Sequence, residues 1–88
     1  MSEEQSYCAR ADALEELIER SKDPRSLEIL SEICAEEKAS LAPYTVSKNA
    51  DLRAMYTPNY ERFGELFDKA REKMYQIRSN PRAVQCRA

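Results

Sequence analysis

The sequence predicts an all-α fold, a small three-helix bundle in which an antiparallel helical hairpin packs on a longer third helix. Six apolar residues between positions 60 and 77 recur at steps of three and four, which places them on one stripe of a helix. A single glycine in the chain disfavours an all-β fold, which needs many glycine-bearing turns. Four prolines lie near predicted helix edges.

The first predicted helix covers residues 4–21. Its apolar residues recur at steps of four, three and four, and glutamates occupy the solvent side. Asp23-Pro24 marks the next boundary, because aspartate accepts hydrogen bonds from the free amides of a helix start and proline fits the first helical position. The short link at residues 21–23 predicts an antiparallel neighbour. The apolar positions of this first helix are Tyr7, Ala11, Leu14 and Ile18.

The second predicted helix covers residues 24–42. Pro43 is expected to end it, because proline has no backbone amide to donate and its ring clashes with the preceding turn. The apolar stripe of this helix consists of Leu27, Leu30 and Cys34, and it is widened by Ile29, Ile33 and Leu41.

Residues 43–57 have the least regular pattern. A short additional helix over residues 50–56, capped by Ser47 or Asn49, is expected within this segment. Thr57-Pro58 repeats the cap-then-proline signal, and the third helix is therefore predicted to begin there.

The third helix is predicted to run to residue 79, because Asn80-Pro81 then ends the helical pattern. We therefore expect one helical domain over residues 1–79, followed by a basic and flexible C-terminal tail over residues 80–88.

The composition fits one small folded domain. Charged residues make up 34% of the chain and the mean hydropathy is −0.76, but a hydrophobic fraction of 42% is enough for a core. No apolar run approaches the ~18 residues of a membrane-spanning helix. The first residues lack the basic start and apolar stretch of a secretion signal. We therefore expect a cytoplasmic protein without membrane contact.

Cysteine and histidine usage narrows the chemistry. Three cysteines without a secretion signal indicate free thiols. Cys8 and Cys34 are expected at similar heights of the first hairpin, either as two small core residues or as a redox pair. The chain has no histidine, which removes most routes to a zinc site and to histidine-based catalysis. We expect no metal, no cofactor and no catalytic residue, and hence a protein that is not an enzyme.

Charge is unevenly distributed along the chain. Residues 1–44 contain five basic and eleven acidic residues, a net charge of −6, whereas residues 45–88 contain nine basic and five acidic residues, a net charge of +4. The two halves are expected to attract each other, within one molecule or between two.

The third helix carries the candidate surface for binding another protein. One interpretation places its apolar stripe in the core, and the other makes part of it a partner surface, including a homo-oligomer. Gly64 either lies at an exposed position that tolerates a glycine or marks a point where another backbone approaches closely. The candidate partner-binding residues are Tyr60, Phe63, Gly64, Phe67, Arg71, Met74 and Arg78.

Three further surfaces are candidates. Glu28, Glu32 and Glu36 lie at steps of four and form an acidic face: a solvated surface, a docking site for basic residues of the third helix, or a mimic of nucleic-acid phosphates. The basic C-terminal stretch is a candidate for binding nucleic acid. The tyrosines of the irregular segment either cover one end of the core or form a ligand pocket, and the candidate pocket residues are Tyr44, Lys48, Arg53 and Tyr56.

These observations favour a small non-catalytic interaction module, such as an adaptor, a chaperone-like protein or a regulatory protein, that acts through an apolar helix surface and forms a homo-oligomer. The alternative is a small acidic inhibitor or sequestering protein, because phage-encoded inhibitors of host factors have a similar composition. A nucleic-acid accessory protein that uses the basic C-terminal stretch is a third hypothesis.

Overall fold

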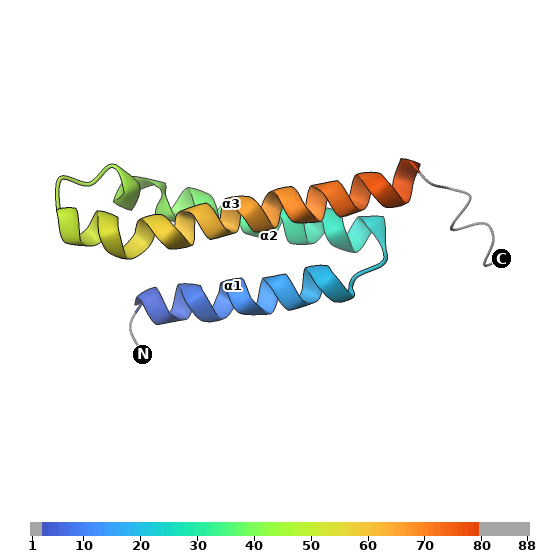
Figure 1. Cartoon of the computed structure of the whole chain (residues 1–88), viewed down its shortest axis with the longest axis horizontal. Helices are drawn as coiled ribbons and strands as arrows, with labels where there is room; N and C mark the ends of the chain where they lie inside the picture. Colours follow the sequence, from blue (N-terminus) through green and yellow to red (C-terminus); the bar gives the residue numbers. More distant parts are fainter. Residues whose placement is uncertain (1–2, 80–88) are drawn as a thin grey trace.

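The computed structural model describes residues 3–79, and almost all of them are helical (Figure 1). Helix α1 spans Glu3–Arg20, α2 spans Pro24–Thr45 and α3 spans Ala50–Ser79. The predicted all-α class is confirmed, and within residues 3–79 no strand occurs. The molecule is elongated, with extents of 54 × 24 × 14 Å.

Helix α3 is the common partner of the other two helices. It packs antiparallel to α2 along most of its length, and α1 lies against α3 in the opposite direction to α2 (Figure 1). Helices α1 and α2 are antiparallel, as predicted, but they touch each other least. The first two helices are therefore held together mainly through the third.

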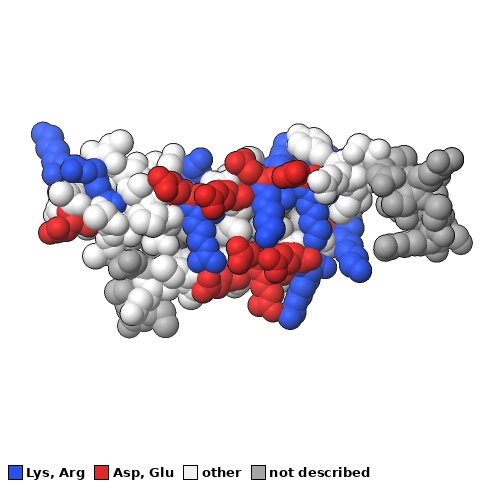
Figure 2. Space-filling view, in the orientation of Figure 1, with Lys and Arg blue, Asp and Glu red and all other residues white. Residues whose placement is uncertain are grey.

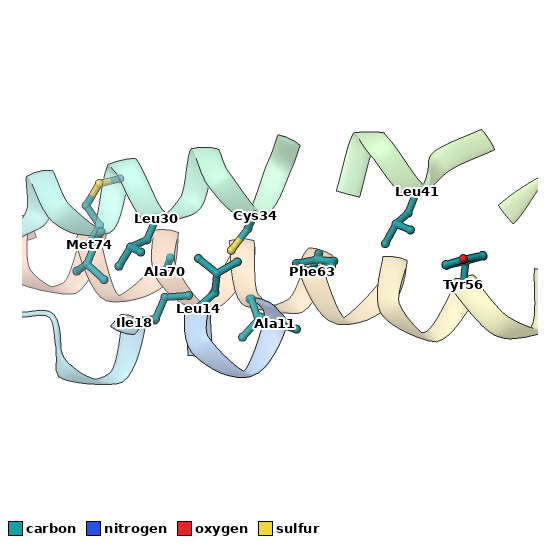
Figure 3. Packing of buried hydrophobic residues seen from close by; sticks show 12 residues of the cluster. Ala11, Leu14, Ile18, Leu30, Cys34, Leu41, Tyr56, Phe63, Ala70 and Met74 are labelled. Atoms are coloured by element: carbon teal, nitrogen blue, oxygen red, sulfur yellow. The ribbon is translucent and has the colours of Figure 1, made fainter. Parts of the chain in front are cut away.

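The core lies along the inner stripe of α3. Leu14 and Ile18 of α1 approach α3 from one side, while Leu30 and Cys34 of α2 approach it from the other (Figure 3). Phe63 is fully buried among them. The buried apolar residues are Ala11, Leu14, Ile18, Leu27, Leu30, Cys34, Leu41, Tyr56, Phe63, Leu66, Ala70 and Met74.

Two side chains cap helix starts as their sequence positions predict. The Asp23 carboxylate accepts from the Ser26 amide at 3.3 Å, and Pro24 occupies the first turn of α2. The Asn49 side-chain oxygen accepts from the amides of Asp51 and Leu52, at 2.9 and 3.4 Å. Both caps satisfy amides that have no partner inside the helix.

Pro43 and Pro58 do not mark helix boundaries as predicted. Helix α2 continues through Pro43 to Thr45, and the expected short helix and third helix are one continuous helix that runs through Pro58. An interior proline costs about 3 kcal/mol relative to alanine. Burying one large apolar side chain returns roughly 1.5–3 kcal/mol. Tyr56, on the N-terminal side of Pro58, is 5% exposed, and Leu52 packs on the core, so tertiary contacts outweigh the local preference.

Ion pairs join the acidic first half of the chain to the basic second half. Arg62 of α3 lies 2.6 Å from Asp12 of α1, and Lys69 lies 3.1 Å from Glu19. Figure 2 shows the same pattern, with basic side chains between bands of acidic ones. The attraction expected from the charge distribution therefore acts within one molecule. Each exposed pair contributes at most about 1 kcal/mol.

Lys73 fixes the end of α1 on α3. Its ammonium group donates to the backbone carbonyl oxygens of Ile18 and Glu19, at 2.8 Å each. These carbonyls belong to the last turn of α1, where no intrahelical donor is available and the helix dipole is negative. Burial of Ala11, Leu14 and Ile18, together with these two hydrogen bonds at the C-terminus of α1, fixes the direction of α1 against α3.

Cys8 and Cys34 are both free thiols in the structure. The Cys8 thiol donates to the side-chain oxygen of Asn59 at 3.4 Å, while Cys34 is fully buried. Burial, reinforced by the carboxylate of Glu37, raises the pKa of the Cys34 thiol from 9.0 to about 11. Because the thiolate is the reactive form, Cys34 behaves as a core residue.

We expect Pro58→Ala to raise the free energy of unfolding by about 2 kcal/mol, because alanine restores the hydrogen bond to the preceding turn and its gain in helix propensity exceeds the added freedom of the unfolded chain. Pro24→Ala is the matched control, since proline costs no hydrogen bond in the first turn, and it should change stability little or slightly lower it. Urea unfolding monitored by circular dichroism measures both. If Pro58→Ala lowered stability, the helix would break at Thr57-Pro58, as the sequence pattern alone suggests.

We expect the stability contribution of Cys34 to fall as the pH rises from about 9 to about 11. Above pH 9 the unfolded state releases the thiol proton while the folded state keeps it, so the unfolded state binds fewer protons and gains relative stability. The full difference is on the order of 2–3 kcal/mol. Unfolding free energies of the native chain and Cys34→Ala across this range isolate the effect, and parallel pH profiles of the two proteins would contradict it.

Candidate functional site

An open apolar groove lies between α2 and α3. It has a volume of about 280 Å³, and its surface is mostly apolar. Among the described residues, its lining comes from α2 and α3 alone, with no contribution from α1. The lining residues are Ala35, Lys38, Ala39, Ala42, Tyr60 and Phe67.

The spacing of these residues explains why a groove forms. Ala35, Ala39 and Ala42 follow one another at steps of four and three, so they share one face of α2 beside its buried stripe. Tyr60 and Phe67 lie two turns apart on α3, with Gly64 between them. The small alanine side chains make the groove shallow on the α2 side, whereas the two larger rings border it on the α3 side.

Two cations lie over the aromatic rings at this site. The Lys38 ammonium is 5.0 Å from the centre of the Tyr60 ring, and the Arg71 guanidinium is 5.7 Å from the rings of both Phe67 and Tyr75. Such contacts contribute about 0.5–1 kcal/mol at exposed positions. The rim of the groove on the α3 side is therefore positively charged.

Gly64 faces the side chain of Lys38. A Cβ atom added at Gly64 would lie 3.2 Å from the Lys38 ammonium nitrogen and 3.4 Å from the adjoining carbon. The neighbour is the far end of a flexible side chain, so it moves aside easily. Packing within the chain therefore does not require glycine at this position.

The structure divides the predicted partner-binding residues into two groups. Phe63 and Met74 are 0% and 1% exposed and belong to the core, so they are not part of a surface. The aromatic rings of Tyr60 and Phe67 are only partly buried. The residues that remain at the surface are Tyr60, Gly64, Phe67, Arg71 and Arg78. The stripe that appears uniform in the sequence thus has a covered side and an open side.

The predicted acidic surface is only partly free. Glu28 lies 3.7 Å from Arg78 of α3, so one of the expected contacts between this face and basic residues of the third helix is present. Glu32 and Glu36 are exposed. Lys73, another basic residue of α3, binds the end of α1.

The four residues proposed for a ligand pocket lie at the joint between α2 and α3. The rings of Tyr44 and Tyr56 stack with centres 4.5 Å apart, and Tyr56 is buried. The Arg53 guanidinium donates to the backbone carbonyl of Ser47, and Lys48 is exposed. This arrangement favours the interpretation in which the tyrosines cover the end of the core.

Sequence reasoning missed a second apolar surface, formed by Leu17 of α1 with Ile29 and Ile33 of α2. These side chains are 51%, 51% and 38% exposed. Ile29 and Ile33 were expected to widen the buried stripe of the second helix, but the limited contact between α1 and α2 leaves all three side chains at the surface. The signal in the sequence is their position one residue beside each stripe, which places them at the edge of the buried face.

The described residues contain no cluster of three or more histidine, cysteine, aspartate or glutamate side chains suited to holding a metal ion. Within the same part of the chain, none of the helices combines the length and the apolar character that crossing a bilayer requires.

Comparisons of the chain with protein-family models, with curated proteins and with solved structures found no match.

Proposed function

We propose that the protein is a non-catalytic protein–protein interaction module, and that the groove between α2 and α3 binds an amphipathic helix. The observation that carries this proposal is that Tyr60 and Phe67 are only partly buried and border a row of alanines, in a groove to which α1 contributes no residue. Docked helices commonly bury such an apolar face in a groove between two helices of the receptor.

The groove favours a helix because of its shape. The groove is open and is lined by residues of α2 and α3, and the small residues on the α2 side allow a third helix to approach closely. Burying one large ring such as Phe67 contributes roughly 1.5–3 kcal/mol. A few such contacts support an interaction of moderate affinity.

The charges at the rim favour an acidic helix. Lys38 and Arg71 lie over the aromatic rings and present positive charge to whatever occupies the groove. A helix with acidic residues beside its apolar stripe pairs with them, and the pairing fixes its orientation more than it adds affinity.

The two other functional hypotheses have less support. The acidic face is partly neutralised by the pair between Glu28 and Arg78. A mimic of nucleic acid requires a continuous negative surface. The basic tail that a nucleic-acid accessory protein would use lies outside the described residues.

We expect a photo-cross-linking amino acid at Ala39 to form a covalent adduct of one defined mass in cells of the source organism. The same group at Ala13, which is exposed on α1 away from the groove, is the matched control and should form none. Mass spectrometry identifies each adduct and the partner residue joined.

A second change separates groove binding from chance proximity. Ala35→Lys places a long, charged side chain at an exposed position one turn from Ala39 and should abolish the adduct while the helical circular dichroism stays unchanged. Adducts of equal yield at Ala39 and Ala13, or an adduct that survives Ala35→Lys, would refute the proposed function.

A further inference from the structure

We propose that the groove is covered by the α2/α3 face of a second copy of this chain, and that two copies form a symmetric dimer. In this dimer α2 of each copy lies antiparallel on α3 of the other, and the two-fold axis runs along the helices. The inference rests on the proposed function, because it assigns an occupant to the same groove.

The sizes of the side chains support this pairing. The outer face of α2 carries Ala35, Ala39 and Ala42, while the outer face of α3 carries Tyr60 and Phe67. When α2 of one copy faces α3 of the other, each row of small residues meets a row of large rings, and interdigitation of large and small side chains is what dense packing requires. Gly64, which packing within the chain does not require, lies between the two rings in sequence.

The charges support the same pairing. Below its alanine row α2 continues with Glu28 and Glu32, and at the same end of the molecule α3 carries Arg71 and Arg78. An axis along the helices keeps every residue at its own height, so the acidic end of each α2 meets the basic end of the partner's α3. Helix α2 thus has the small apolar row and the acidic flank that the groove favours.

The other symmetric arrangement fits less well. An axis across the helices places α2 against α2 and α3 against α3. The alanine rows then face each other and leave gaps, while the bulky rings of the two α3 helices meet. Only the axis along the helices sets small against large and acidic against basic at both of its equivalent contacts.

The available area is sufficient for a dimer. From Arg53 to Arg78 helix α3 extends about 38 Å at 1.5 Å per residue. Two helices side by side, with axes 8–10 Å apart, present a face about 20 Å wide. The product is about 760 Å² on each copy, close to the roughly 800 Å² per partner of a standard interface.

The test uses two charge-reversal variants of the full chain. One is Glu28→Lys with Glu32→Lys, and the other is Arg71→Glu with Arg78→Glu. Each alone places like charges at both equivalent contacts of the dimer, and we expect its dissociation constant to rise at least tenfold. In an equimolar mixture every altered position meets an opposite charge on the other chain, so mixed dimers should form with the affinity of the native protein.

The mixture separates contacts between chains from contacts within one chain, because each variant keeps its own internal repulsion in the mixed dimer. The control is Glu61→Lys with Glu65→Lys, which makes the same change in net charge at exposed positions outside the groove and should leave the dissociation constant unchanged. Sedimentation equilibrium gives the constants, and native mass spectrometry distinguishes mixed dimers from dimers of one variant.

The native chain should be dimeric at about 100 µM, because interfaces of standard size commonly have dissociation constants below that concentration. A monomer at that concentration, or variants that do not recover on mixing, would overturn the proposed dimer. The proposed function survives that result if the Ala39 cross-link joins another protein and is lost in Ala35→Lys. It fails as well if Ala39 forms no adduct.

Discussion

Phe63, Ala70 and Met74 are buried between α1 and α2, and the rest of the fold depends on this contact along α3. Within residues 3–79, each of the other two helices has more contact with α3 than the two have with each other. The contact along α3 sets the antiparallel direction of α2 and holds α1 in place although α1 and α2 touch each other little. Burial of Tyr56 and packing of Leu52 keep α3 continuous through Pro58. Ion pairs and the Lys73 clamp then fix α1 in one register.

A helix that buries one stripe between two neighbours keeps its other side free. On α3 the edge of that free side toward α2 is apolar: the partly buried rings of Tyr60 and Phe67 lie there, and the adjoining face of α2 is a row of alanines. A chain of this length has a small core, and such domains commonly complete their burial through association. The open groove therefore forms because α1 and α2 together cover only part of the apolar surface of α3.

Much of this architecture follows from the sequence. Periodicity identified the helices and their inner faces, and cap residues such as Asp23 and Asn49 placed two helix starts. Local signals failed where tertiary packing outweighs them: Pro43 and Pro58 resemble boundaries, yet burial of Tyr56 nearby is worth as much as the hydrogen bond that proline removes. Periodicity also could not divide the α3 stripe into Phe63, which is covered, and Phe67, which borders the groove, because residues four positions apart share a face.

The chain contains only two phenylalanines, and they report separately on the two sides of α3. Fluorine NMR of protein labelled with 4-fluorophenylalanine, in the presence of a soluble paramagnetic gadolinium complex, compares their access to solvent within one sample. The account predicts that in dilute protein the Phe67 resonance broadens while the Phe63 resonance does not. Equal protection of both rings in dilute protein would show that the groove is closed, and equal broadening would show that the inner stripe is not covered.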